Sequence, residues 1–180
     1  QYPILLQQPV SGEEMTVSFS ASGGKLLSYD VYRPVVKRRQ NGPASVIETL
    51  YRPNWEPALR SLVQHLEYSG FGGLDVFEQS ATTLPTVIEV NLRPTHSLQA
   101  TPQTGSQVLS SFADQLIGRR PLPKTSHPEL KATVALFPDE YVRDPDSPYL
   151  CKGPVAIPWS DRQLSGYLMK LAGLTSKQKD

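Results

Sequence analysis

The clearest pattern of polar and apolar positions lies between residues 72 and 94. Two runs rich in Ile, Val and Phe, at 72–78 and 85–94, are separated by a short polar loop, and Gly and Pro stand at their ends. Such runs are typical of β-strands. If residues 80–85 form the turn, the two strands fold back on each other as an antiparallel hairpin.

Alternation along the second strand sorts its side chains onto two faces, because successive residues of a strand point to opposite sides. Ile88 and Val90 share one face, and Val87, Glu89 and Asn91 share the other. The antiparallel hairpin then places Ile88 and Val90 against a hydrophobic core and leaves Glu89 and Asn91 on the opposite face.

Antiparallel pairing also brings residues of the first strand to these faces. Asp75 and Phe77 join the face of Glu89 and Asn91, while Leu74 and Val76 join the core face. Two carboxylates and an amide oxygen suit a hard cation such as magnesium, and adjacent acids repel unless a positive charge lies between them. A half-exposed hairpin whose polar face is simply solvated has the same alternation.

The rest of the chain predicts an α+β fold, with a mostly antiparallel sheet and helices packed on one face. A basic loop is expected at 33–45, where four cations and a Gly-Pro break occur. The other predicted elements are a short strand at 4–6, a strand with Met15, Val17 and Phe19 alternating, a turn at 22–25, a strand at 26–32, a helix capped by Asn54, a helix at 108–116, a strand at 131–138, and a last helix opening at 160–163 with Leu164, Tyr167, Leu168 and Leu171 buried.

Composition limits the function classes. The chain has 180 residues and a net charge of +1, which gives no reason to propose nucleic acid or a membrane surface as a partner. Its one cysteine, Cys151, excludes an internal disulfide and a cysteine-based zinc site. No apolar run approaches a membrane span and no signal peptide opens the chain, so a cytoplasmic location is expected. Because the first residue is Gln1, we expect the chain to begin inside a longer protein.

The specific residues of the hairpin carry more information than their polar and apolar alternation. Val-Ile-Glu89-Val-Asn91-Leu-Arg93-Pro, after Gly-Phe-Gly-Gly-Leu-Asp75-Val-Phe, resembles the metal-binding hairpin of the ATP-grasp superfamily, in which an acidic strand precedes a strand ending Glu-x-Asn-x-Arg. The resemblance implies that Glu89 and Asn91 bind the Mg²⁺ that bridges ATP phosphates, with Asp75 as the third ligand. Glu78 competes with Asp75 for that role. Arg93 would lie near phosphate or the acceptor substrate.

A second stretch resembles the hinge between the two ATP-grasp subdomains. Gln7 to Val10 would contact adenine through the backbone, and Glu14, after Gly12, would hold the ribose hydroxyls. This sequence departs from the family pattern because Gln7 and Gln8 replace the usual acids. Because the family recognises adenine largely through the main chain, we expect Gln7, Gln8, Val10 and Glu14 to bind the nucleotide.

The basic loop also has a counterpart in the family, where such a segment faces the phosphates and the acceptor carboxylate. The resemblance makes a set of four cations candidates for this role, although a solvated run of charge has the same composition. Lys37 and Arg39, together with Arg93, are the catalytic candidates. His96 follows the metal motif and is either an acceptor-site residue or an ordinary loop residue. The four cations are Arg33, Lys37, Arg38 and Arg39.

The resemblance covers residues 4–118, so we expect an ATP-grasp carboxyl-terminal subdomain at 1–120 and an extension packed on it at 121–180. It implies a ligase that uses ATP and Mg²⁺ to join a carboxylate to an amine or similar nucleophile through an acylphosphate. The phosphate-binding lysines of the family's first subdomain would precede Gln1, so the isolated chain is expected to be inactive. The alternative is a non-catalytic interaction module that retains the fold.

Overall fold

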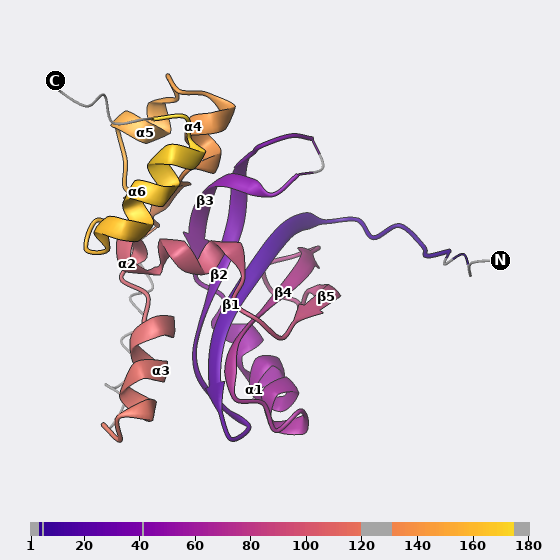
Figure 1. The fold of residues 1–180 in the computed structure, drawn as a ribbon. Helices are drawn as coiled ribbons and strands as arrows, with labels where there is room; N and C mark the ends of the chain where they lie inside the picture. Colours follow the sequence, from indigo (N-terminus) through magenta and orange to yellow (C-terminus); the bar gives the residue numbers. More distant parts are fainter. Residues whose placement is uncertain (1–3, 5, 41, 120–130, 175–180) are drawn as a thin grey trace, which may run out of the picture.

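The computed structural model describes residues 4, 6–40, 42–119 and 131–174. Within these residues, seven strands form one sheet in the order β5-β4-β1-β2-β3-β6-β7 (Figure 1). Neighbouring strands are antiparallel except β6 and β7, which are parallel. The strands are β1 (Glu13–Ser22), β2 (Lys25–Lys37), β3 (Ala44–Leu50), β4 (Gly70–Glu78), β5 (Thr86–Asn91), β6 (Thr133–Leu136) and β7 (Val155–Ala156).

Helices cover both faces of this sheet, with α1 and α3 on opposite sides (Figure 1). The expected α+β class with a mostly antiparallel sheet is confirmed. The expectation that the helices pack on one face of the sheet is wrong. The reason lies in β1, whose neighbouring residues Val17 and Ser18 point to opposite faces and are both fully buried. The helical elements are η1 (Pro53–Trp55), α1 (Glu56–His65), η2 (His96–Ala100), α2 (Thr101–Thr104), α3 (Val108–Leu116), α4 (Asp139–Arg143), α5 (Pro148–Cys151) and α6 (Arg162–Leu171).

The first face of the sheet carries the larger hydrophobic core. Alternate β1 residues, among them Met15, Val17 and Phe19, pack with Leu59 and Val63 of α1. Each buried aliphatic or aromatic side chain of this kind contributes about 1.5–3 kcal/mol. The helix predicted after Asn54 is thus confirmed, but its predicted cap is not. Asn54 instead donates from Nδ2 to the carbonyls of Ala81 and Thr83, at 3.3 and 3.4 Å.

The second face is covered by η2, α2 and α3. Its apolar part centres on Tyr32, Ile47 and Ala100, and Phe71 of β4 contacts Phe112 of α3 with ring centroids 4.7 Å apart. This face is more polar than the first, because alternate β1 residues there are Thr16, Ser18 and Ser20. Polar side chains on a covered sheet face need partners, and the loop before η2 supplies several of them.

The β1–β2 turn is confirmed at the predicted place. Gly23 and Gly24 have φ angles of +54° and +71°, which a two-residue hairpin turn requires and which glycine adopts without steric cost. The strand that follows is longer than predicted. β2 continues to Lys37 and β3 begins at Ala44, so the described part of the basic segment lies outside strands only at residues 38–40, 42 and 43.

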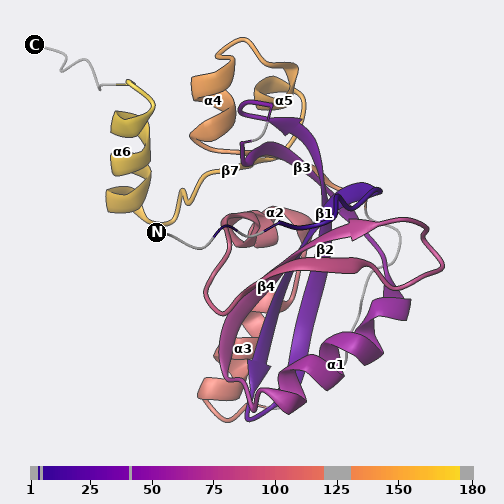
Figure 2. The same cartoon turned by 90° about the vertical axis from the view of Figure 1, so that its right-hand side faces the viewer.

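Two predictions at the ends of the described chain are wrong. Ile4 and Leu6, the described residues of the strand expected at 4–6, lie in no strand and are 87% and 90% exposed, because no described strand lies beside them to pair with. Leu5 lies outside the described residues. α6 forms as predicted, with Asp161 capping Leu164 N–H. Its expected buried stripe is instead largely exposed, and in Figure 2 the helix stands apart from β4 and β5.

The chain after the undescribed residues 120–130 returns to the same sheet. β6 pairs with β3, and α4 and α5 follow at the end of the sheet near β3 (Figure 1). The division at residue 120 stays a prediction. Among the helices of the described residues, none is long and apolar enough to cross a bilayer.

Candidate functional site

The predicted metal ligands lie together on the second face. Asp75 pairs with Glu89 across β4 and β5, and Gly73 pairs with Asn91, so all three oxygen-bearing side chains share one face. The Asn91 Nδ2 atom donates a hydrogen bond to Asp75 Oδ2 over 3.4 Å. The hairpin geometry expected from the sequence is therefore present, whereas its metal-binding role stays a prediction.

One detail of the hairpin differs from simple alternation. The register shifts next to Asp75, so that Val76 pairs with Val87 and Ile88 is the extra residue of a bulge. Val87 consequently shares the face of Val76, not that of Glu89. Val87, Ile88 and Val90 are 42–48% exposed, because β5 is an edge strand that the core under α1 does not include.

The electrostatics of this face favour a cation. Burial raises the pKa of Asp75, and the negative charges of Glu89 and Glu14 raise it further, while hydrogen bonds from Thr16 and Asn91 act the other way. Thr16 Oγ1 donates to Asp75 Oδ1 at 3.4 Å. A carboxylate in such surroundings is stabilised by any positive charge placed beside it.

The donor set fits Mg²⁺ better than a transition metal. Within the described residues, no three or more His, Cys, Asp and Glu side chains are placed to hold a metal ion. Magnesium needs fewer protein ligands, since it usually retains waters and binds one or two carboxylates together with substrate phosphates. Asp75 and Glu89, with the amide oxygen of Asn91, meet that requirement.

Glu78 does not compete for this site. It lies on the first face, where its Oε1 and Oε2 accept from Arg52 Nε and Nη2 at 2.5 and 2.8 Å. Its side chain is 6% exposed. Glu78 therefore belongs to a buried ion pair behind the hairpin.

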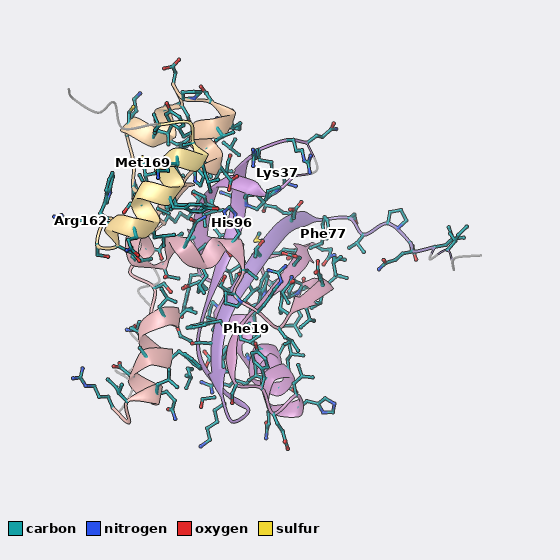
Figure 3. All side chains as sticks on the ribbon, viewed as in Figure 1. Phe19, Lys37, Phe77, His96, Arg162 and Met169 are labelled. Carbon is teal, nitrogen blue, oxygen red and sulfur yellow. The ribbon has the colours of Figure 1, made fainter. Side chains whose placement is uncertain are left out.

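Glu14, the predicted ribose ligand, extends the acidic face by one position. It pairs with Phe77 across β1 and β4, and its carboxylate forms an ion pair with Lys37 Nζ. Lys37 lies at the end of β2, near the β2–β3 loop, and Figure 3 labels it together with His96 in the upper half of the molecule. The structure thus links five predicted residues side by side: Lys37, Glu14, Asp75, Glu89 and Asn91.

Other predicted residues lie outside this group. Gln7 and Gln8 are exposed and Val10 is partly buried, and all three lie in the irregular segment before β1. Arg39 is exposed in the β2–β3 loop, and Arg93 donates to the Pro94 carbonyl at 3.2 Å. The structure gives none of them a contact with the acidic group.

Arg33 and Arg38, the remaining cations of the basic segment, are engaged in ion pairs. Arg33 pairs with Glu13 and Glu48, on the strands beside it. Arg38 Nη1 lies 3.1 Å from Asp139 Oδ1 at the start of α4. Only Lys37 of the four therefore contacts an acid on the candidate face.

Sequence reasoning missed the polar contacts that hold the loop before η2, and the start of η2 itself, on this face. Ser18 Oγ lies 2.9 Å from Thr95 Oγ1 and 2.9 Å from Ser97 Oγ. Gly73 leaves room for the same loop: a Cβ there would lie 2.4 Å from Thr95 Cγ2 and 2.7 Å from the Val17 carbonyl oxygen. The available signal was the run of hydroxyl residues at alternate positions of a buried strand.

His96 lies in the chain between Thr95 and Ser97, the two residues that contact Ser18. Its Nε2 lies 2.9 Å from Asp139 Oδ2, while Arg38 contacts the other oxygen of the same carboxylate. The imidazole is 43% exposed and Asp139 is 15% exposed. Asp139 thus joins α4 to the β2–β3 loop and to the start of η2.

The hollow between the start of β6, α5 and the segment before β7 is separate from this face. Its volume is about 420 Å³ and its lining includes Lys131, Tyr149 and Lys152. None of the predicted site residues lines it.

Comparisons with known proteins give weak similarities. No family model matches the chain, and no curated protein matches it. One similar structure is the biotin carboxylase domain of a thermophilic 2-oxoglutarate carboxylase bound to bicarbonate, at 14% identity over 67% of this chain and 29% of that chain, with a TM-score of 0.46.

Two further similar structures come from another kind of enzyme. N5-carboxyaminoimidazole synthase from Aspergillus clavatus, in complex with ADP and 5-aminoimidazole ribonucleotide, has 12% identity, coverages of 67% and 34%, and a TM-score of 0.47. The phosphoribosylaminoimidazole carboxylase ATPase subunit from Aquifex aeolicus has 12% identity, coverages of 67% and 38%, and a TM-score of 0.48.

The chain therefore spans about a third of the length of these three structures, 29–38% in each case. They are ATP-grasp enzymes. At identities of 12–14% and TM-scores of 0.46–0.48, the similarities are too weak to assign this chain to a family.

Proposed function

We propose that this chain is the carboxyl-terminal part of the ATP-grasp domain of a carboxylate–amine ligase. The observation that carries the proposal is the shared face of Asp75, Glu89 and Asn91 on neighbouring antiparallel strands. The raised pKa of Asp75, caused by burial and by the charge of Glu89, supports a cation between these side chains.

Asp75, Glu89 and Asn91 would hold the Mg²⁺ of bound ATP, and a bound ion of this kind neutralises charge on the phosphates. Phosphoryl transfer depends mainly on positioning and on such charge neutralisation. Lys37 lies within reach of the same face through its ion pair with Glu14. Arg39 and Arg93 are exposed cations that we assign to phosphate or acceptor contacts.

The proposed reaction joins a small-molecule carboxylate to an amine or similar nucleophile through an acylphosphate. Glu14 would bind the ribose, and the backbone of Gln7, Gln8 and Val10 would bind adenine. The preceding half of the ATP-grasp domain would supply the remaining phosphate contacts. The 180-residue chain alone should therefore bind Mg-ATP weakly and not turn it over.

A non-catalytic module with the same fold is the second candidate. It is favoured by one observation, namely that Gln7 and Gln8 lie outside the sheet as exposed, irregular chain. In that case the acidic face would be a remnant without bound nucleotide.

Calorimetric titration of the full-length parent protein with Mg-ATP separates the two. We expect binding that Glu89→Gln and Asn91→Ala each abolish, with the circular dichroism spectrum unchanged because both residues lie on β5 at the sheet edge. Glu67→Gln is the matched control, since Glu67 is an exposed acid at the end of α1.

Absence of Mg-ATP binding by the wild-type parent would favour the non-catalytic module. Retained binding in Glu89→Gln and Asn91→Ala would show that the nucleotide site lies elsewhere. Submillimolar affinity of the isolated chain for Mg-ATP would overturn its expected dependence on the preceding half.

A further inference from the structure

The contact between His96 and Asp139 has the geometry of an oriented imidazole. A separation of 2.9 Å between Nε2 and a carboxylate oxygen requires a proton on Nε2. Among the described residues, no other hydrogen bond or ion pair involves the imidazole, so Nδ1 has no protein partner. Arg38 holds the second oxygen of Asp139 and so fixes the carboxylate that orients the ring.

The position of His96 relates this pair to the acidic face. The residues on either side of it, Thr95 and Ser97, both contact Ser18 of β1. Ser18 lies two residues along the strand from Thr16, which donates to Asp75, a separation of about 6.6 Å at the usual rise of a strand. The start of η2, which carries His96, is therefore packed against the same face as the proposed Mg²⁺ ligands.

We propose that His96, held by Asp139, is the proton acceptor for the amine substrate. Nδ1 takes a proton from the substrate ammonium, and the Asp139 carboxylate stabilises the resulting imidazolium. The neutral amine then attacks the acyl carbon of the acylphosphate, forming the C–N bond. The C–O bond breaks, phosphate leaves with the electron pair, and the second proton that the nitrogen loses passes to the leaving phosphate. This inference rests on the proposed ligase function and adds to it the residue that activates the nucleophile.

The orientation of the ring is tested first, on the 180-residue chain with ¹⁵N-labelled histidine. Long-range ¹H–¹⁵N spectra distinguish the two neutral tautomers. We expect His96 in the Nε2–H form and exposed His65 as a mixture. Asp139→Ala should convert His96 to a mixture as well, whereas Asp144→Ala should not. An Nδ1–H tautomer in the wild-type chain would overturn the proposal.

Proton transfer is tested with acetyl phosphate and methylamine, in the presence of Mg²⁺, as a small acylphosphate and a small amine. We expect the chain to accelerate formation of N-methylacetamide. His96→Ala should reduce that acceleration about 100-fold, the lower range for a general base, and added imidazole should restore part of it. Asp139→Asn should lower the rate less, and His65→Ala should leave it unchanged.

Rescue by imidazole separates a proton acceptor from a structural residue, because a misfolded variant is not restored by a small base. No acceleration by wild type, or an unchanged rate in His96→Ala, would overturn the inference. Calorimetry with Mg²⁺ alone distinguishes a failure of this inference from a failure of the proposed function. If Mg²⁺ binds and Asp75→Asn abolishes the binding, but His96→Ala has the wild-type rate, only the inference fails. If Mg²⁺ does not bind and the parent protein does not bind Mg-ATP either, the proposed function fails.

Discussion

The side-chain amide of Asn91 donates to the carboxylate of Asp75 across the β4–β5 hairpin, with 3.4 Å between Nδ2 and Oδ2. The amide nitrogen thus lies beside the Asp75 carboxylate, which a cation in the same place would stabilise more strongly than the amide does. An incoming Mg²⁺ would require the amide to present its oxygen instead. Asn91 is only 9% exposed, so this exchange would occur next to the loop before η2 and would change its packing.

The pKa of Asp75 predicts how stability depends on pH without metal. Burial and Glu89 raise this pKa, so the folded state holds the proton more tightly than the unfolded state does. Asp75 therefore destabilises the fold progressively as pH rises from its ordinary pKa through the raised one. We expect Asp75→Asn to be more stable than wild type at pH 7 and to lose that advantage at low pH.

Urea unfolding at several pH values measures this difference. Mg²⁺ binding to the wild-type chain should strengthen as pH rises through the same range, since the ion needs the carboxylate form. A stability gap between Asp75→Asn and wild type that does not vary with pH would contradict the assigned cause.

The carboxylates of Glu78, behind the hairpin, and Glu89, on the candidate face, should have opposite phenotypes when each is replaced. Glu78 forms a buried pair with Arg52, so Glu78→Gln should lower the free energy of unfolding by about 3 kcal/mol. Glu89 is exposed, and Glu89→Gln should change stability by less than about 0.5 kcal/mol. Mg²⁺ affinity, measured by calorimetry on the folded variants, should fall in Glu89→Gln and persist in Glu78→Gln. The reverse pattern would place the ion on the first face.

Gly73 should be intolerant of any side chain. The Cβ of Gly73→Ala would overlap Thr95 and the Val17 backbone, and such overpacking costs about 1–3 kcal/mol. Gly166→Ala is the matched control, because nothing lies within 4 Å of its Cβ position inside α6 and alanine favours a helix by about 1 kcal/mol. Thermal unfolding should show a lower Tm for the first variant only. Equal Tm values would mean that Thr95 moves away freely.

Glu140 should stabilise the attachment of α4 to β3. It is fully buried and accepts hydrogen bonds from Arg143, Ser45 and Ser147. Burial alone would raise its pKa, but these hydrogen bonds outweigh burial and lower it. Its contribution is therefore present above the ordinary glutamate pKa and is lost as pH falls through the lowered value.

Glu140→Ala should cost about 3–5 kcal/mol at pH 7, because it leaves two buried hydroxyls, those of Ser45 and Ser147, and the guanidinium of Arg143 without their partner. The cost should shrink at low pH, as measured by urea unfolding. Asp146→Asn, at an exposed position in the same region, should be neutral. A loss below about 1 kcal/mol for Glu140→Ala would show that water replaces the carboxylate.

Local patterns predicted most of the hairpin and its polar face. Alternation along residues 86–91 depends only on strand geometry, and the shared face of Asp75, Glu89 and Asn91 follows from antiparallel pairing. The bulge at Ile88 did not follow, because nothing in the local sequence distinguishes a bulged residue from a regular one. The exposure of Val87 and Val90 also depends on strand order, which alternation does not specify.

Contacts between distant segments were the least predictable part of the site. The ion pair of Lys37 with Glu14 and the contact of His96 with Asp139 join residues that are far apart in the chain. From the sequence, Lys37 was only one cation of a basic segment and His96 only an isolated histidine, and neither acidic partner could be identified. The irregular conformation of Gln7 and Gln8 likewise depends on whether another strand is available to pair with them.

The pairing of β6 with β3 has a practical consequence for anyone shortening this protein. Ending an expression fragment at residue 120 would remove β6 and leave the hydrogen-bonding groups of β3 open to solvent. Such a bare strand recruits strands from other molecules. A fragment of that length should therefore be prone to aggregation, and soluble preparations will need residues 131–156 retained.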